Sequence, residues 1–137
     1  MNSKEIEEYK SHLRLNPLQK EVLVGILLGD ACLETQNGRT YRVKLEQSLQ
    51  HAAYINHLYD LFKDWCLQPP QIKKTGKSIW CSTVSHSAFR FFAHQFYRKN
   101  QKIVPKLIHR WLTARAFAYW YMDDGSIKSR ESKGVIL

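Results

Sequence analysis

Hydrophobic and polar residues follow two different periods along this chain, and each change of period marks a new element. Between residues 17 and 30 the apolar positions recur every three or four residues, as in a helix with one buried face. Asn16 and Pro17 suit the start of this helix, because Asn is a good N-cap and Pro fits the first helical position. Gly25 and Gly29 lie inside it, four residues apart. Since a glycine within a helix costs roughly 1 kcal/mol relative to alanine, the pair predicts a close approach by another backbone.

The next stretch alternates with a period of two, which is typical of a strand with one buried face. Residues 32–48 are predicted to form a hairpin whose turn contains Gln36, Asn37 and Gly38. In its second strand, residues 41–47, the apolar side chains Tyr41, Val43 and Leu45 face one way and Arg42, Lys44 and Glu46 the other. Residues 72–84 predict a second hairpin, with a turn at Thr75, Gly76 and Lys77.

Helical periods return between and after the hairpins. Residues 51–66 predict an amphipathic helix with a buried stripe made of Ile55, Leu58, Tyr59, Phe62, Trp65 and Cys66. A later helix carries Phe89, Phe92, Ala93 and Phe96 on one face, which we interpret as core. Residues 1–15 are charged and predict a helix or arm outside the core. The predicted order is helix, hairpin, helix, hairpin, helix, followed by a second strongly apolar run.

Both strongly apolar runs end at a carboxylate followed by a small residue. The first, LVGILLGDA (23–31), ends at Asp30 and Ala31, and the second, FAYWYMDDG (117–125), ends at Asp123, Asp124 and Gly125. An acid at the C-terminal end of a helix is disfavoured by roughly 0.3–1 kcal/mol. A divalent cation bound between the two ends would offset that cost, and such cations serve phosphodiester hydrolysis.

This doubled pattern resembles the LAGLIDADG homing endonucleases. The resemblance implies that Asp30 and Asp124, which fall on the last acid of each motif, are the metal-binding, catalytic acids, with Mg²⁺ as the cofactor. Asp123 falls on the motif's second alanine, so no catalytic role is carried over to it. It is either a partner of the metal ligands or a surface acid, and we place it with Ala31 in the predicted metal site.

Two further positions are interpreted through the resemblance. Lys102, in the sequence KIVP, resembles the basic element before the second motif, which implies a catalytic lysine that stabilises negative charge or orients water. The alternative is an ordinary lysine of a basic loop. Tyr119 replaces the motif glycine that Gly25 supplies in the first copy. We therefore expect asymmetric packing, in which Gly25 and Gly29 leave room for Tyr119 and Met122.

The family resemblance implies an α+β fold: an αββαββα unit with a curved antiparallel sheet that straddles DNA. We expect residues 1–112 to form the first unit with an N-terminal arm, and residues 113–137 to begin a second, incomplete one. Only 13 residues follow Asp124, in which residues 126–130 predict a strand, 131–134 a turn and 135–137 the start of its partner. A fragment, a truncated gene and half of a split protein all fit this ending, and exposed apolar surface there predicts self-association. We expect the chain alone to be weak or inactive as a nuclease, because it would cover only about half of a DNA site.

The composition supports a nucleic-acid partner. Twenty-one basic against 12 acidic residues give a formal charge of +9, which attracts polyanions. The cations lie on the polar side of the hairpins, where we predict DNA contacts by Arg42, Lys44, Glu46, Lys73, Lys74 and Lys77. No apolar run reaches the ~20 residues of a membrane span, and three cysteines without a CxxC pair indicate reduced thiols. We therefore expect an intracellular protein of a prokaryotic cytoplasm or an organelle.

The leading functional hypothesis is a site-specific, metal-dependent double-strand DNA endonuclease of the intron or intein homing type. The alternatives are an RNA-binding intron maturase, whose partner is intron RNA, and a non-cleaving DNA-binding remnant. The target sequence does not follow from these residues, because specificity also depends on DNA deformation.

Overall fold

A computed structural model describes residues 2–125, with the backbone alone for Asp124 and Gly125. Contacts divide the chain into two compact units that interleave along the sequence. Among the described residues, one unit contains 2–15 and 32–90, and the other contains 16–31 and 91–125. This division reflects packing; the predicted repeat boundary between residues 112 and 113 concerns sequence order and stays a prediction. The strand and turn predicted within residues 126–137 lie outside the described residues.

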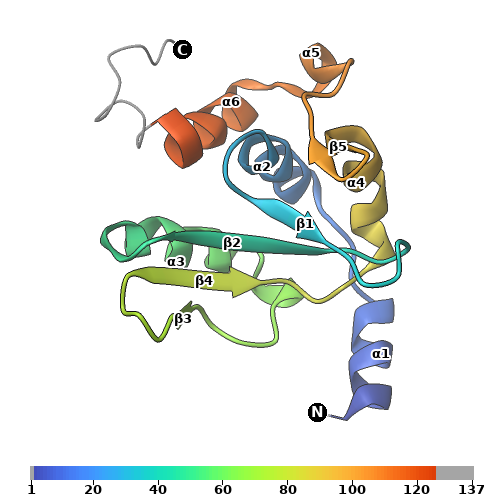
Figure 1. The fold of residues 1–137 in the computed structure, drawn as a ribbon. Helices are drawn as coiled ribbons and strands as arrows, with labels where there is room; N and C mark the ends of the chain where they lie inside the picture. The colour runs from blue at the N-terminus through green and yellow to red at the C-terminus, as the bar shows by residue number, and fades with distance from the viewer. Residues whose placement is uncertain (1, 126–137) are drawn as a thin grey trace. The chain divides into compact units, whose positions relative to one another are not determined.

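The first unit is built on a four-stranded antiparallel sheet in the order β1-β2-β4-β3 (Figure 1). Its strands are β1 (Cys32–Glu34), β2 (Arg42–Ser48), β3 (Gln71–Ile72) and β4 (Ser78–Ser82). Both predicted hairpins are therefore present, and β2 and β4 pair along the centre of the sheet. β2 begins one residue later than predicted, because Tyr41 forms an isolated bridge with His86 instead. Val43 and Leu45 are buried and Arg42 is exposed, as the alternation predicts.

One helix covers the apolar face of this sheet. α3 (Ala52–Leu61) packs on β2 and β4, and short 3-10 turns flank it, η1 (Leu49–His51) and η2 (Lys63–Trp65). The helix predicted over residues 51–66 is thus shorter than expected, because the chain tightens after Leu61. Most of the predicted stripe is buried, namely Ile55, Leu58, Phe62 and Trp65. Tyr59 and Cys66 are only half-buried, so the prediction of full burial was wrong for these two.

The N-terminal segment forms a helix, α1 (Ser3–Ser11), as one of the two expectations for it stated. None of its residues is buried. His86 ties it to the rest of the unit: its Nδ1 accepts the Ala88 amide (2.9 Å), so Nε2 carries the proton and donates to the Lys10 carbonyl (3.0 Å). The Tyr9 hydroxyl adds a hydrogen bond to the Asp64 carbonyl. These contacts fix α1 without giving it a core.

The second unit contains both apolar runs. α2 (Pro17–Leu28) begins with a capping box between Asn16 and Gln19, which confirms the predicted start. After η3 (Ser87–Phe89) of the first unit, the chain enters α4 (Arg90–Phe96), whose residues from Phe91 onward belong here. The hairpin of β5 (Tyr97–Arg98) and β6 (Gln101–Lys102) follows. The unit then has α5 (Ile108–Trp111), α6 (Ala114–Trp120) and a π-helical turn, η4 (Tyr121–Gly125).

The three cysteines, Cys32, Cys66 and Cys81, are not joined by disulfides. Cys66 and Cys81 share a side-chain hydrogen bond, which together with burial raises the pKa of the Cys66 thiol. In the part of the chain that the structure describes, no helix is long and apolar enough to cross a membrane.

Candidate active site and nucleic-acid interface

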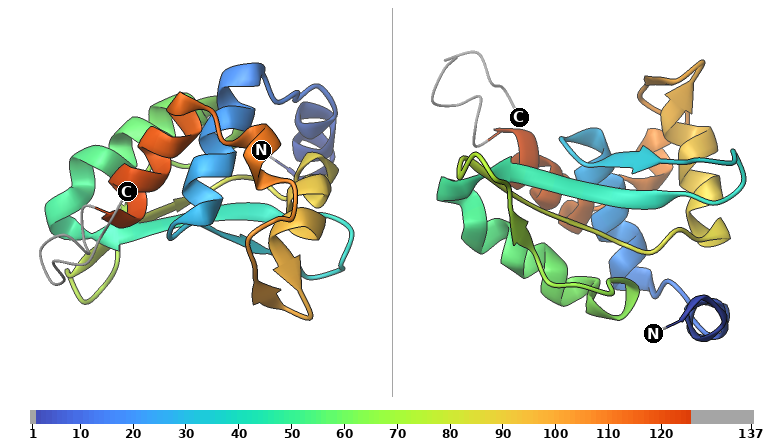
Figure 2. Two further views of the ribbon diagram at one scale, coloured as in Figure 1. Left: turned by 90° about the horizontal axis from the view of Figure 1, so that it is seen from above. Right: turned by 60° about the horizontal axis from the view of Figure 1, so that its bottom comes forward.

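The second unit brings the two apolar runs together, because α2 and α6 lie side by side (Figure 2). A Cβ placed on Gly25 would meet the Ala116 carbonyl oxygen, the Tyr119 Cβ at 2.8 Å and the Trp120 nitrogen at 3.1 Å. The predicted close approach of a backbone to Gly25, and the room it leaves for Tyr119, are both observed. Burial raises the pKa of Tyr119, although the nearby charge of Arg115 acts in the opposite direction.

Gly29 also makes room, but for a different residue than expected. A Cβ on Gly29 would collide with the carboxylate of Asp123, whose own Cβ lies 2.9 Å from that position. Met122, which we expected there, is 39% exposed. Asp123 is only 2% exposed, so its interpretation as a surface acid was wrong. The reason is geometric: the residue after Met122 is the one that the turn of η4 directs towards α2. The backbone amide of Asp30 donates a hydrogen bond to the Asp123 carboxylate.

Asp30 lies just beyond the end of α2. The helix ends at Leu28, and Gly29 leaves the helical conformation with φ −96° and ψ −130°. The Ala31 amide then donates back to the Ile26 carbonyl (3.1 Å), which closes the turn around Asp30. The side chain of Asp30 is exposed, whereas Ala31 is buried. The sequence thus places the exposed carboxylate of Asp30 just after the end of α2, in a turn whose backbone is held by the hydrogen bond from Ala31 to Ile26.

Lys102, at the end of β6, reaches the same turn. Its Nζ donates to the carbonyl of Gly29 (2.6 Å) and to that of Ala31, which flank Asp30 in the sequence. The structure therefore brings together Asp30, Ala31, Asp123 and Lys102, four of the predicted site residues. The catalytic role of Lys102 stays a prediction.

Asp124 follows Asp123 in η4, so its backbone belongs to the same end of the α2 and α6 pair. Its side chain lies outside what the structure describes, and its partnership with Asp30 stays a prediction. Among the described side chains, no group of three or more His, Cys, Asp or Glu residues is arranged to hold a metal ion.

The sheet of the first unit has a polar face that carries several predicted DNA contacts. Arg42 forms an ion pair with Glu34 on the neighbouring strand, with Nη2 and Oε1 2.8 Å apart. Lys44 lies over the ring of Trp80, 5.6 Å from its centroid. Such stacking of a cation on an aromatic ring stabilises the side chain in one orientation.

Glu46 is the acidic member of this face and holds two of the lysines. Its Oε1 lies 3.0 Å from Lys73 Nζ and 3.9 Å from Lys44 Nζ. Burial raises the pKa of Glu46, but hydrogen bonds from Lys73 and Ser78 and the charges of both lysines outweigh it and lower the pKa overall. Glu46 therefore stabilises the sheet when ionised, and this contribution falls as the pH drops through its lowered pKa. The other predicted lysines of this turn are exposed, namely Lys74 and Lys77.

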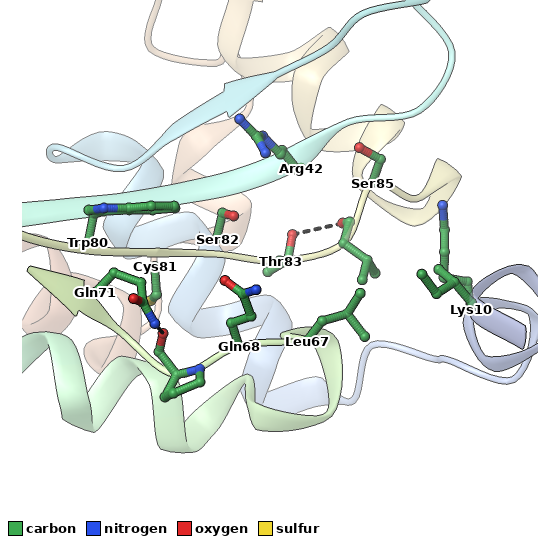
Figure 3. A pocket seen from close by; sticks show the side chains of 13 residues that line it. Lys10, Arg42, Leu67, Gln68, Gln71, Trp80, Cys81, Ser82, Thr83 and Ser85 are labelled. Carbon is green, nitrogen blue, oxygen red and sulfur yellow. Dashed lines mark hydrogen bonds between the residues drawn. The ribbon is translucent and has the colours of Figure 1, made fainter. Parts of the chain in front are cut away.

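Sequence reasoning missed several residues of the same face. Register places Ser82 opposite Lys44, and Trp80 between Glu46 and Gln71. The alternation of β4 could have identified them, because Trp80 and Ser82 alternate with the buried residues Ile79 and Cys81. β3 pairs with β4 only at Trp80 and Ile79, and a pocket of about 390 Å³ lies along the open remainder of β4 (Figure 3). Polar side chains line much of it, including Lys10, Arg42, Gln68, Gln71, Ser82 and Ser85.

The paired motif helices and the polar sheet agree with a comparison against families of known proteins. Residues 20–137 match the family model described as the LAGLIDADG DNA endonuclease family. The chain belongs to this family. The predicted resemblance is confirmed, and so is the α+β fold class of a LAGLIDADG unit.

Comparisons with individual proteins show how much of each one the chain covers. It is 36% identical over 132 residues to a chloroplastic pentatricopeptide repeat-containing protein, OTP51, of Oryza sativa subsp. japonica, covering 92% of the chain and 17% of that protein. It is 30% identical over 149 residues to a probable intron-encoded endonuclease of Wickerhamomyces canadensis, covering 99% of the chain and 64% of that protein. A solved structure of the homing endonuclease I-WcaI bound to its DNA recognition sequence matches with a TM-score of 0.78 at 29% identity, covering 90% of this chain and 58% of that one. The chain thus spans less than two thirds of each of these proteins.

Proposed function

We propose that the chain is part of a site-specific double-strand DNA endonuclease of the homing type. The observation that carries the proposal is the Asp30 turn: the first motif's acid stands exposed at the end of α2, against the second motif, with Lys102 on its flanking carbonyls. Family membership and a cationic sheet face support the same function. A pair of neighbouring antiparallel strands, such as β2 and β4 of this sheet, fits the major groove of DNA.

The donors at this turn suit a hard divalent cation such as Mg²⁺, which prefers carboxylate and carbonyl oxygens. Asp30 and Asp124 would hold it through their carboxylates, and Ala31 could contribute only its backbone carbonyl. When bound, the cation would supply an activated water and charge stabilisation at the phosphate. Lys102 would place positive charge beside the same turn, where negative charge develops on the phosphate.

Metal removal tests the activity directly. The intact protein to which the chain belongs, incubated with a randomised library of double-stranded DNA, is expected to cut a defined subset of sequences in Mg²⁺ and none in EDTA. Sequencing of the cut ends measures this, and restoring Mg²⁺ in excess controls for loss of protein. Cleavage that persists in EDTA, or no sequence-specific cleavage in Mg²⁺, would contradict the proposal.

The polar sheet face gives a second expectation. Replacing Arg42 and Lys44 with alanine is expected to weaken DNA binding and to lower the slope of log affinity against log salt by about one unit per lost phosphate contact. Lys63→Ala serves as the matched control, because this exposed lysine lies in η2, outside the sheet. Fluorescence anisotropy over a salt series measures both quantities. Equal effects of the control and the sheet variants would mean that only total charge matters.

The remaining partners belong to the proposal as well. Intron RNA, the partner of the alternative maturase function, stays a prediction, as does self-association of the chain. We also propose that the protein acts where intron- or intein-bearing DNA is found, in a prokaryotic cytoplasm or an organelle.

A further inference from the structure

The predicted metal site includes Asp123, but this carboxylate is buried and accepts a hydrogen bond from the Asp30 amide, which points to a role other than metal ligation. We propose that Asp123 is a positioning residue: its carboxylate holds the backbone amide of Asp30 and so fixes the direction in which the Asp30 side chain leaves the end of α2. This inference rests on the proposed function for its catalytic meaning. The contact itself is a property of the chain alone.

Burial is the first support. Asp123 is 2% exposed, and a carboxylate so far from water must be hydrogen-bonded or paired. Its carboxyl group accepts a hydrogen bond from the Asp30 amide, which satisfies this requirement. A buried oxygen that is turned to a backbone amide serves as an acceptor, whereas the exposed carboxylate of Asp30 is the one that a cation and a phosphate can reach.

The shape of the site is the second support. Gly29 and Asp123 occupy the same position, the seventh of nine, in their respective motifs. A Cβ on Gly29 would overlap the Asp123 carboxylate, so the absence of a side chain on one helix makes room for the acid on the other. The two residues form one packing unit, and a change in either must disturb the Asp30 amide.

The turn around Asp30 is therefore held through both a backbone amide and backbone carbonyls. Asp123 engages its amide, and Lys102 Nζ engages the carbonyls of Gly29 and Ala31 on either side. These contacts restrict the φ angle of Asp30 and the orientation of the two adjoining peptide groups. If the backbone of Asp30 were less restrained, its carboxylate would bind the cation more weakly and cleavage would be slower, since small displacements of catalytic groups are costly.

The Asp30 amide gives a readout that needs no catalysis. In ¹H–¹⁵N spectra of the metal-free 137-residue chain, Asp123→Ala is expected to move the Asp30 amide proton upfield and to reduce its protection from hydrogen exchange about tenfold. Asp123→Asn keeps an acceptor oxygen, so most of the protection should remain. Asp60→Ala, an exposed carboxylate of α3, is the matched control and should leave the Asp30 amide unchanged.

Cleavage assays then separate positioning from direct metal ligation. In the intact protein, we expect Asp123→Ala to slow cutting at least about tenfold with DNA affinity unchanged. We expect Asp123→Asn to stay within about threefold of the unsubstituted protein. A direct ligand would behave differently, because asparagine removes the charge that binds the cation: equal losses in both variants would overturn the proposal.

Gly29→Ala provides an independent variant should Asp123→Ala fail to fold. It is expected to reproduce the amide shift and the loss of rate, and the double variant should be no worse than the more severe single one. Additive losses of cleavage rate in the double variant would overturn the inference. So would an Asp30 amide whose shift and protection are unchanged in Asp123→Ala, Gly29→Ala and the double variant. If the intact protein does not cut DNA at all, the proposed nuclease function fails, while the amide measurements still decide whether Asp123 holds Asp30.

Discussion

Asp30→Asn and Asp124→Asn are each expected to lower the rate of DNA cleavage by at least about 100-fold, because each removes a charged oxygen ligand of the proposed cation. Neither acid attracts phosphate, so the affinity for DNA should stay within about twofold of the original. Asparagine is close to isosteric with aspartate, and the exposed position of Asp30 makes a folding defect an unsuitable explanation for such a loss.

Single-turnover cleavage in Mg²⁺ and anisotropy in its absence measure the two quantities separately. Asp60→Asn, which changes an exposed acid of α3, controls for the loss of one negative charge. Undiminished cleavage by both motif variants would remove Asp30 and Asp124 from the chemistry. Loss of binding in parallel with cleavage would instead assign them to DNA contact.

Gly25→Leu is expected to lower the free energy of unfolding by about 3 kcal/mol, because a side chain there would enter the space that Ala116 and Tyr119 occupy. Gly25→Ala should also destabilise, by about 1 kcal/mol, since the steric clash exceeds the gain in helix propensity. The direction of the change for Gly25→Ala is informative, because a glycine-to-alanine change in an exposed helix would raise the free energy of unfolding by roughly 1 kcal/mol.

Urea unfolding followed by tryptophan fluorescence measures these changes. Lys20→Ala is the control on the same helix, because Lys20 is exposed and its replacement leaves the contact with α6 intact. An increase in stability for Gly25→Ala would mean that α2 and α6 do not approach each other closely in solution.

The elements of the fold were predictable because their signals are local. Each strand and helix has its own period of apolar residues, and caps such as Asn16 with Gln19 act within four positions of the chain. The αββαββα order followed, and so did the division of β2 into a buried and a polar side. The length of the helix after β2 was not predicted: the apolar period continues to Trp65, which is buried, although the α-helix ends at Leu61 and a 3-10 turn begins at Lys63.

The two motifs were also predictable, since each is a continuous run that ends in an acid. What only the tertiary structure decided is which side chains meet at their ends. Asp123 and Met122 are neighbours in the sequence and equally plausible partners of Gly29, yet one is buried and the other exposed. That choice depends on the π-helical path of η4 against α2, a contact between residues more than 90 positions apart.

The same reason applies to the other site residues. Lys102 lies more than 70 positions from Asp30, and Trp80 reaches Lys44 only through the pairing of β4 with β2. The sequence by itself determined the family and most of the elements, and it predicted which acids of the two motifs are catalytic. The three-dimensional packing determined which groups orient those acids, because hydrogen bonds between distant backbone and side-chain atoms leave no periodic trace in the sequence.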